Sequence, residues 1–188
     1  STMPPGFGRA WPKIDHGRTK IVGQVNAPVV PVCRLQARAV TEPRTGLYIY
    51  DLGQEIAGVP VIRLRGKAGT EVVIRYGEML YPDLPEYGSL KGLMLTENYR
   101  DAESIDRYIL RGDREGEVYC PRFTFHGYRY IEISGVEQAP ELSEVESLQL
   151  SSVARITGEI ETSNPLLNRF IENVWWSQLA SFISIPTD

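Results

Sequence analysis

Residues 59–76 read Val-Pro-Val-Ile-Arg-Leu-Arg-Gly-Lys-Ala-Gly-Thr-Glu-Val-Val-Ile-Arg-Tyr and carry a clear β-strand signal. After Pro60 apolar and charged side chains alternate, which places Arg63 and Arg65 on one face of a strand. The second apolar run, residues 71–76, is rich in β-branched residues. Because residues 66–69 between the two runs contain two glycines, we expect a β-hairpin here.

Strand patterns continue on both sides of this stretch, with turn signals between them. Short strands at intervals of roughly a dozen residues favour an antiparallel β-sandwich or jelly roll over a parallel α/β sheet. The fold class that we predict is therefore mostly β, an antiparallel β-sandwich followed by one C-terminal α-helix. Further strands are expected at residues 47–52, 106–110, 117–119, 128–134, 144–150 and 156–161, with a short one near residues 19–22.

The helix is expected to begin near Ser163 and to run to about Ala180. Ser163 or Asn164 can accept hydrogen bonds from the free N–H groups of the first turn, and Pro165 suits the first helical position. Apolar residues then recur at helical spacing. They are Leu167, Phe170, Ile171, Val174 and Trp175. Pro186 favours an extended segment after the helix.

Composition excludes several classes of protein. Of the 188 residues, 42% are hydrophobic, so the chain can bury a sizeable core. The net charge of −4 argues against a nucleic-acid or anionic-membrane partner, because both need a basic surface. No apolar run is long enough for a transmembrane helix. We expect a soluble protein, cytoplasmic or exported, with Cys33 and Cys120 as two buried thiols or, as the alternative, one disulfide.

Side chains for metal or cofactor chemistry are scarce. The two histidines, His16 and His126, are far apart in sequence, and no metal-ligand spacing includes them. We therefore expect no metal and no cofactor. A glycosidase needs two carboxylates flanking the scissile bond, but these carboxylates are equally explained as salt-bridge or turn partners. The candidates are Asp51, Glu55, Glu78, Asp106 and Glu132.

The connection at residues 80–103 interrupts the strand pattern. Connections of this length inside a compact domain are often functional. We interpret this one as a surface loop, and Tyr81, Tyr87 and Tyr99 are its candidates for contact with a sugar.

Two runs of the sequence are distinctive, PRFTFHGYRY at residues 121–130 and YDLGQEIAG at residues 50–58. The first is close to the pattern P-x-F-T-x-H-G-[FY]-R-Y, and the second resembles D-[FL]-G-Q-N-x-x-G with Glu55 in place of the usual Asn. In both patterns the chain resembles bacterial α-L-rhamnosidases. Ser181 likewise stands where the family usually has Asn. Five motifs fall in the family's order over residues 31–188, the others lying at 66–80, 98–112 and 163–188.

This resemblance implies a concanavalin-like β-sandwich and a linker helix, followed in the family by an (α/α)-barrel that carries the catalytic acid and base. We therefore divide the chain into a linker or tail of a preceding domain (1–31), the sandwich (32–162), and the linker helix with the start of the catalytic domain (163–188). No catalytic residue is expected within the chain. Asp188 matches the family's P-T-D aspartate at the rhamnose pocket, which makes it a candidate substrate-binding residue. The alternative is a capping aspartate at a helix start.

Three functions stay open. The chain is a non-catalytic support for an inverting α-L-rhamnosidase acting on plant glycans or glycosides, a carbohydrate-binding module, or an interaction surface around Trp175 and Trp176. On the first reading, its partners are its own catalytic barrel and, through the full-length enzyme, a rhamnose-containing carbohydrate.

Overall fold

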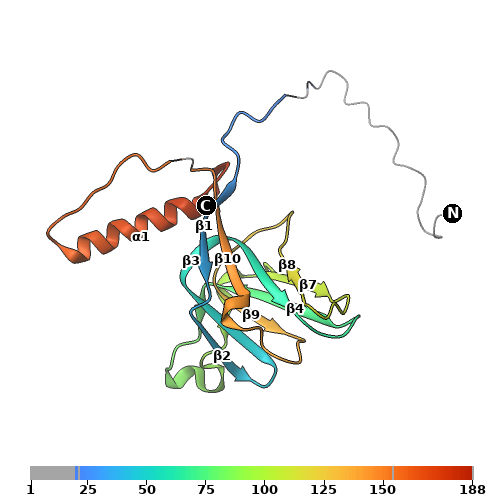
Figure 1. Cartoon of the computed structure of the whole chain (residues 1–188). Coiled ribbons are helices and arrows are strands. Elements are labelled where there is room, and N and C mark those ends of the chain that lie inside the picture. Colours follow the sequence, from blue (N-terminus) through green and yellow to red (C-terminus); the bar gives the residue numbers. More distant parts are fainter. Residues whose placement is uncertain (1–19, 21, 154, 188) are drawn as a thin grey trace.

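A computed structural model describes residues 20, 22–153 and 155–187 of the protein (Figure 1). Ten strands, three 3₁₀ turns, one helix and a final strand pair follow one another along the chain. They are β1 (Val30–Gln36), β2 (Ala39–Arg44), β3 (Leu47–Leu64), β4 (Glu71–Gly77), β5 (Met79–Leu80), η1 (Pro85–Leu90), β6 (Met94–Leu95), η2 (Glu97–Tyr99), β7 (Ile105–Ile109), β8 (Glu117–Tyr119), β9 (His126–Ser134), η3 (Leu142–Glu144), β10 (Val145–Ser151), α1 (Pro165–Ser181), β11 (Phe182–Ile183) and β12 (Ile185–Pro186).

Eight strands pair antiparallel in the order β1-β10-β3-β9-β4-β7, with β2 and β8 also pairing with β3. Strand β3 is 18 residues long and changes partners along its length. Its first part pairs with β2 and with residues 130–134 of β9. Its second part pairs with β10, β8 and the start of β9. One long strand therefore belongs to both layers of the sandwich.

The corner of β3 lies at residues 51–56, where the register with β9 shifts. Gly53 sits in this corner with φ +73°, a conformation that glycine adopts without strain. A Cβ atom at Gly53 would also come within 2.7 Å of Cδ of Arg38. The Asp-Leu-Gly-Gln run is therefore the bend that takes β3 from one layer to the other.

The core lies between the two layers and follows the period-2 pattern expected of half-buried strands. On β4 the side chains of Val72, Ile74 and Tyr76 are fully buried, and they form one cluster with side chains of β1, β3, β9 and β10. The prediction of a mostly β, sandwich-type fold is confirmed.

The predicted β-hairpin at residues 59–76 is wrong. Strand β9 lies between β3 and β4, which do not pair. The second part of β3 already has β10 and β8 as neighbours, so residues 66–69 carry the chain across to the other layer. There the N–H of Gly69 donates to the carbonyl of Leu110 at 2.8 Å.

Other strand predictions need correction as well. The runs 47–52 and 59–65 are one continuous strand, β3. The predicted strand at 156–161 is absent, and Ile156 and Ile160 are exposed because no neighbouring strand pairs with them. Of the proposed strand at 19–22, Thr19 and Ile21 lie outside the described residues, while Lys20 and Val22 are not in a strand.

The helix is confirmed as α1. The side chain of Asn164 accepts hydrogen bonds from the N–H groups of Leu166 at 3.0 Å and Leu167 at 3.4 Å, with Pro165 in the first turn. Asn164, rather than Ser163, is thus the cap. Figure 1 shows α1 projecting beyond one end of the sandwich.

Candidate functional site

The corner of β3 is held by Asp51. Its Oδ1 accepts from the N–H of Gly53 at 2.6 Å and from Nε of Arg129 at 2.8 Å, and its Oδ2 accepts from Nη2 of Arg129 at 2.8 Å. These hydrogen bonds hold the pKa of Asp51 below its usual value, and the hydrogen bond from Arg129 has the largest effect. The Arg129 guanidinium also lies 5.0 Å from the centroid of the Tyr130 ring. Two of the resembling motifs therefore meet here in a structural ion pair.

A second polar cluster surrounds His126. Its Nε2 lies 3.2 Å from Oδ1 of Asp106, and its Nδ1 lies 3.3 Å from Oγ of Ser104. The hydroxyl of Tyr76 donates to the other oxygen of Asp106 at 2.6 Å, and the Tyr76 and His126 rings stack with centroids 4.1 Å apart. Because His126 and Asp106 are only 13% and 14% exposed, this cluster braces the sandwich rather than facing a substrate.

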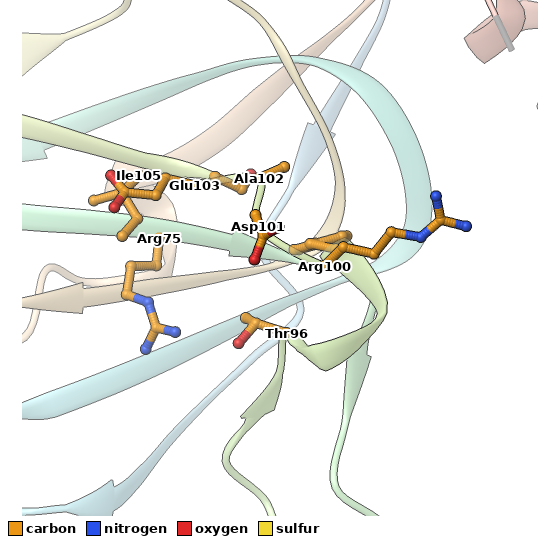
Figure 2. A pocket seen from close by; sticks show the side chains of 9 residues that line it. Arg75, Thr96, Arg100, Asp101, Ala102, Glu103 and Ile105 are labelled. Carbon is orange, nitrogen blue, oxygen red and sulfur yellow. The ribbon is translucent and has the colours of Figure 1, made fainter.

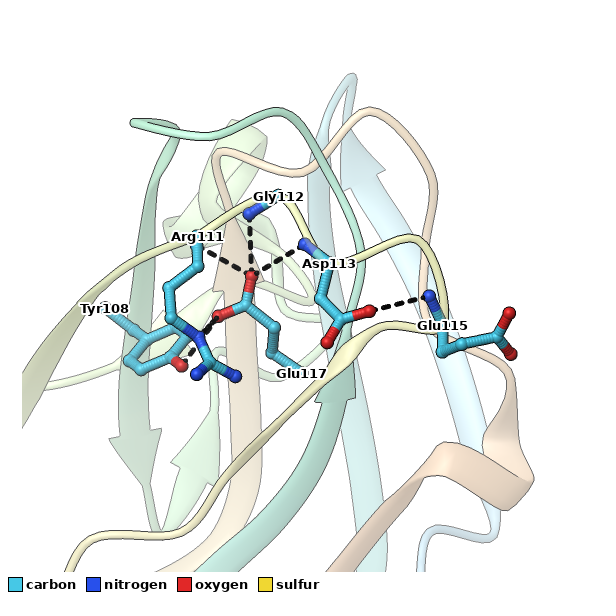
Figure 3. Close-up of polar contacts among 6 residues, drawn as sticks. All are labelled: Tyr108, Arg111, Gly112, Asp113, Glu115 and Glu117. Carbon is cyan, nitrogen blue, oxygen red and sulfur yellow. Dashed lines mark hydrogen bonds and ion pairs between the residues drawn. The ribbon is translucent and has the colours of Figure 1, made fainter.

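The loop between β7 and β8 folds around Glu117, which sequence reasoning did not single out. Its carboxylate accepts from the backbone N–H groups of Arg111 at 2.7 Å and Gly112 at 2.9 Å, and from the hydroxyl of Tyr108 at 2.9 Å (Figure 3). Burial alone would raise the pKa of Glu117, but these hydrogen bonds outweigh it and lower the value to about 2. A glutamate just after a loop with two glycines, at 112 and 116, is the sequence signal for such a nest.

The remaining predicted carboxylates are mostly engaged as well. Glu132 is 3% exposed, and its carboxylate accepts a hydrogen bond from Nη1 of Arg75 at 2.8 Å. The carboxylate of Glu78 accepts a hydrogen bond from the side-chain amide of Asn98 at 2.9 Å. Glu55 differs, since its carboxylate has no hydrogen bond or ion pair to any residue that the structure describes. Desolvation and the neighbouring Glu78 raise the pKa of Glu55.

The connection at 80–103 is a surface segment with short elements of its own, including the β5–β6 pair. Tyr81 is 9% exposed, its hydroxyl donates to Glu97 at 2.8 Å, and its ring packs 5.3 Å from that of Tyr87. Tyr81 is therefore unavailable as an exposed platform for a sugar. The Tyr99 hydroxyl is buried and has no hydrogen-bond partner among the described residues.

A shallow pocket of about 190 Å³ lies where this connection meets β4 and β7. Thr96 and Arg75 line it, together with residues 99–105. In Figure 2 the Arg100 guanidinium is directed away from the other labelled side chains. Arg100 also has φ +57°, a conformation that is uncommon outside glycine.

The helix α1 leaves an apolar face uncovered. Leu166, Phe170 and Val174 recur every four residues, which places them on one face, and they are 80%, 63% and 48% exposed. On another side of the helix Trp176 packs against the sandwich core. The Trp that contacts the core is thus Trp176, and not Trp175 of the predicted stripe.

Two of the residues singled out in the sequence, Asp188 and His16, lie outside the described residues. Residues 20, 22–153 and 155–187 contain no group of three or more metal-ligating side chains. Over the same ranges no helix is long and apolar enough to cross a membrane. Cys33 and Cys120 are free rather than linked, as the first reading expected, but Cys33 is only partly buried and Cys120 is exposed, so the prediction of two buried thiols is wrong.

Two family models match the chain. The model described as bacterial alpha-L-rhamnosidase concanavalin-like domain matches residues 41–151. The model described as bacterial alpha-L-rhamnosidase six-hairpin glycosidase domain matches residues 155–188, the part that contains α1.

Curated relatives and solved structures carry the same name. An alpha-L-rhamnosidase of Streptomyces avermitilis is 41% identical over 98% of this chain and 18% of its own length. An alpha-L-rhamnosidase of Formosa agariphila is 37% identical over 74% of this chain and 14% of its own length. The crystal structure of Streptomyces avermitilis alpha-L-rhamnosidase complexed with L-rhamnose matches with a TM-score of 0.81 and 42% identity, over 89% of this chain and 16% of that one. The structure of alpha-L-rhamnosidase from Dictyoglumus thermophilum matches with a TM-score of 0.79 and 34% identity, over 88% of this chain and 18% of that one. The chain thus spans less than a fifth of the length of these relatives.

Proposed function

The chain belongs to the bacterial α-L-rhamnosidase concanavalin-like domain family, and we propose that it is the non-catalytic β-sandwich of a larger enzyme that releases terminal α-L-rhamnose from plant glycans or glycosides. In that enzyme one carboxylate activates a water while a carboxylic acid protonates the leaving oxygen, with inversion at the sugar. Both groups lie in the rest of the six-hairpin domain.

The uncovered face of α1 carries this proposal. Leu166, Phe170 and Val174 present apolar side chains to water, and contiguous exposed apolar surface marks an interaction site. Because α1 falls within the match to the six-hairpin domain, the natural cover for this face is the remainder of that domain, an (α/α)-barrel. The sandwich then supports the barrel through Trp176, which joins α1 to the sandwich core.

The engaged polar groups support the non-catalytic role. Asp51, Asp106, Glu117 and Glu132 all bind partners within the sandwich, so none of them is free to act on a glycosidic bond. Rhamnose contact from this chain would come from Asp188. Replacing Asp188 by alanine in the larger enzyme should raise KM or lower kcat for an aryl α-L-rhamnoside, and unchanged kinetics would remove Asp188 from the sugar site.

The domain arrangement is tested by one substitution in two settings. Phe170→Asp should leave the melting temperature of the 188-residue chain nearly unchanged, because the ring is 63% exposed there. In the larger enzyme it would bury an unpaired charge and should lower both the melting temperature and the activity. Glu172→Ala, on another face of α1, is the matched control. Equal effects of Phe170→Asp in the two settings would contradict the proposal.

A further inference from the structure

The end of β10 is hydrogen-bonded to the end of α1. The carbonyl oxygen of Phe182, the residue that caps α1, accepts from the backbone N–H of Ser152 at 2.8 Å, from the Ser152 hydroxyl at 3.1 Å and from the Ser151 hydroxyl at 3.2 Å. Figure 1 shows the ends of α1 and β10 side by side at one end of the sandwich. We name Ser151, Ser152, Phe182 and Ser184 the serine latch.

We propose that Ser152 is a positioning residue for the sugar site of the larger enzyme. It acts through the strand pair β11–β12, which carries the chain toward Asp188. This role rests on the proposed function, in which Asp188 contacts the sugar. The sandwich thereby sets the place of a residue that the catalytic domain uses.

The Ser152 hydroxyl holds the β11–β12 pair at two points. It donates to the carbonyl of Phe182 and accepts from the N–H of Ser184 at 3.1 Å. Ser184 lies between the paired residues Ile183 and Ile185 and has φ +74°, a conformation that is uncommon outside glycine. Such a conformation persists where surrounding contacts impose it, and the hydrogen bond to Ser152 is one of those contacts.

The residue before Asp188 is held by the same arrangement. The N–H of Thr187 donates to the carbonyl of Ser181 at 2.9 Å, and its hydroxyl donates to the same oxygen at 3.1 Å. Ser181 is the last residue of α1 and directly precedes the latch residue Phe182. A continuous set of hydrogen bonds therefore runs from Ser152 to Thr187, so a shift at Ser152 should move the backbone next to Asp188.

The sandwich side of the latch is the fixed side. Strand β10 pairs with β1 on one side and with β3 on the other, and Ser151 at its end is fully buried. In the part of the chain that the structure describes, β11 and β12 have two residues each and pair only with one another. The small strand pair therefore takes its position from β10 through the serine latch.

The kinetic test is a double-mutant cycle in the larger enzyme with an aryl α-L-rhamnoside. Ser152→Ala removes both hydrogen bonds of the hydroxyl and keeps the backbone hydrogen bond to Phe182. We expect it to lower kcat/KM about fivefold. In the Asp188→Ala background the same change should lower kcat/KM by less than about twofold, because the position of a carboxylate that has been removed no longer matters. The control Ser143→Ala removes a hydroxyl just before β10 begins and should leave kcat/KM unchanged.

Amide hydrogen exchange in the 188-residue chain provides a readout that does not depend on activity. Ser152→Ala removes the acceptor of the Ser184 N–H, so this amide should exchange about fivefold faster. Amides of β4 and β9 should keep their rates, which establishes that the variant is folded. Unchanged exchange at Ser184 would overturn the latch.

Equal effects of Ser152→Ala on kcat/KM with and without the Asp188 carboxylate would overturn the positioning role, because a merely structural role does not depend on Asp188. The proposed sugar contact fails in a different pattern. Unchanged kinetics of Asp188→Ala would refute that contact and the positioning role together. A clear effect of Asp188→Ala with none from Ser152→Ala would refute the positioning role alone.

Discussion

Replacing Asp51 by alanine removes the contacts that hold the β3 corner. The carboxylate accepts from the N–H of Gly53 at 2.6 Å and takes two hydrogen bonds of 2.8 Å from Arg129. The corner places the first part of β3 against β2 and the second part against β10. Loss of Asp51 should therefore weaken the join between the layers while leaving each pairing pattern intact.

The magnitude follows from the exposure of the two side chains. Asp51 is 28% exposed and Arg129 is 40% exposed, so the ion pair should contribute about 1 kcal/mol. The hydrogen bond from Gly53 to a charged acceptor adds about 1.5 kcal/mol. Asp51→Ala should thus lower the free energy of unfolding by about 2–3 kcal/mol. Asp51→Asn keeps an acceptor for Gly53 and should lower it by only about 1 kcal/mol.

The assay is urea unfolding followed by circular dichroism. With a slope of about 2 kcal/mol per molar, Asp51→Ala should reduce the midpoint by about 1 M. A double-mutant cycle with Arg129→Met isolates the pair, and we expect a coupling of about 1 kcal/mol. If Asp51→Ala cost less than about 0.5 kcal/mol, or no more than Asp51→Asn, the role assigned to the Gly53 hydrogen bond would be refuted.

Two further predictions concern packing and pH. Gly58→Ala should destabilise the chain by about 3 kcal/mol or more, because a Cβ atom there would lie 2.1 Å from the carbonyl oxygen of Leu148. The control is Gly127→Ala on β9, where the added Cβ has no atom within 4 Å, and it should change stability by less than about 0.5 kcal/mol. Equal melting temperatures of the two variants would argue against the close approach of β3 and β10. Glu117 has a folded pKa of about 2 against a usual 4.5, so its stabilising contribution is present above about pH 4.5 and is lost as the pH falls toward 2. Glu117→Gln should flatten the stability profile over that window, and an unchanged acid slope would count against the nest.

Local patterns predicted much of this fold because they depend on neighbours in sequence. The β-branched run at residues 71–76 predicted strand β4, and Ser163 or Asn164 followed by Pro165 predicted the start of α1. The hairpin prediction failed because the partner of β4, strand β9, lies some fifty residues further along the chain. Local sequence patterns do not identify a pairing partner that lies so far along the chain. For the same reason, the apolar residues near Ile156 gave a strand signal although no neighbouring strand pairs with them.

The site shows the same division. Ion pairing of Asp51, Asp106 and Glu132 could be expected from composition, though their partners could not. A shallow groove between β3 and α1 joins Glu55 to Asn173 and Ser177, more than a hundred residues away, so only the packing of α1 brings these residues together. Its one sequence signal was the departure at Glu55 from the family's usual Asn. The Glu117 nest depends on the positive φ of Gly112, and the glycines at 112 and 116 are the one sequence signal for it.

The division of labour between this sandwich and the catalytic domain is tested most directly by turnover of an aryl α-L-rhamnoside. The purified 188-residue chain and the larger enzyme that contains it would be assayed side by side at equal concentration. We predict release of the aryl group by the larger enzyme and none above the buffer rate by the chain. Turnover by the 188-residue chain, lost on Asp51→Ala or Glu55→Ala, would contradict the non-catalytic role.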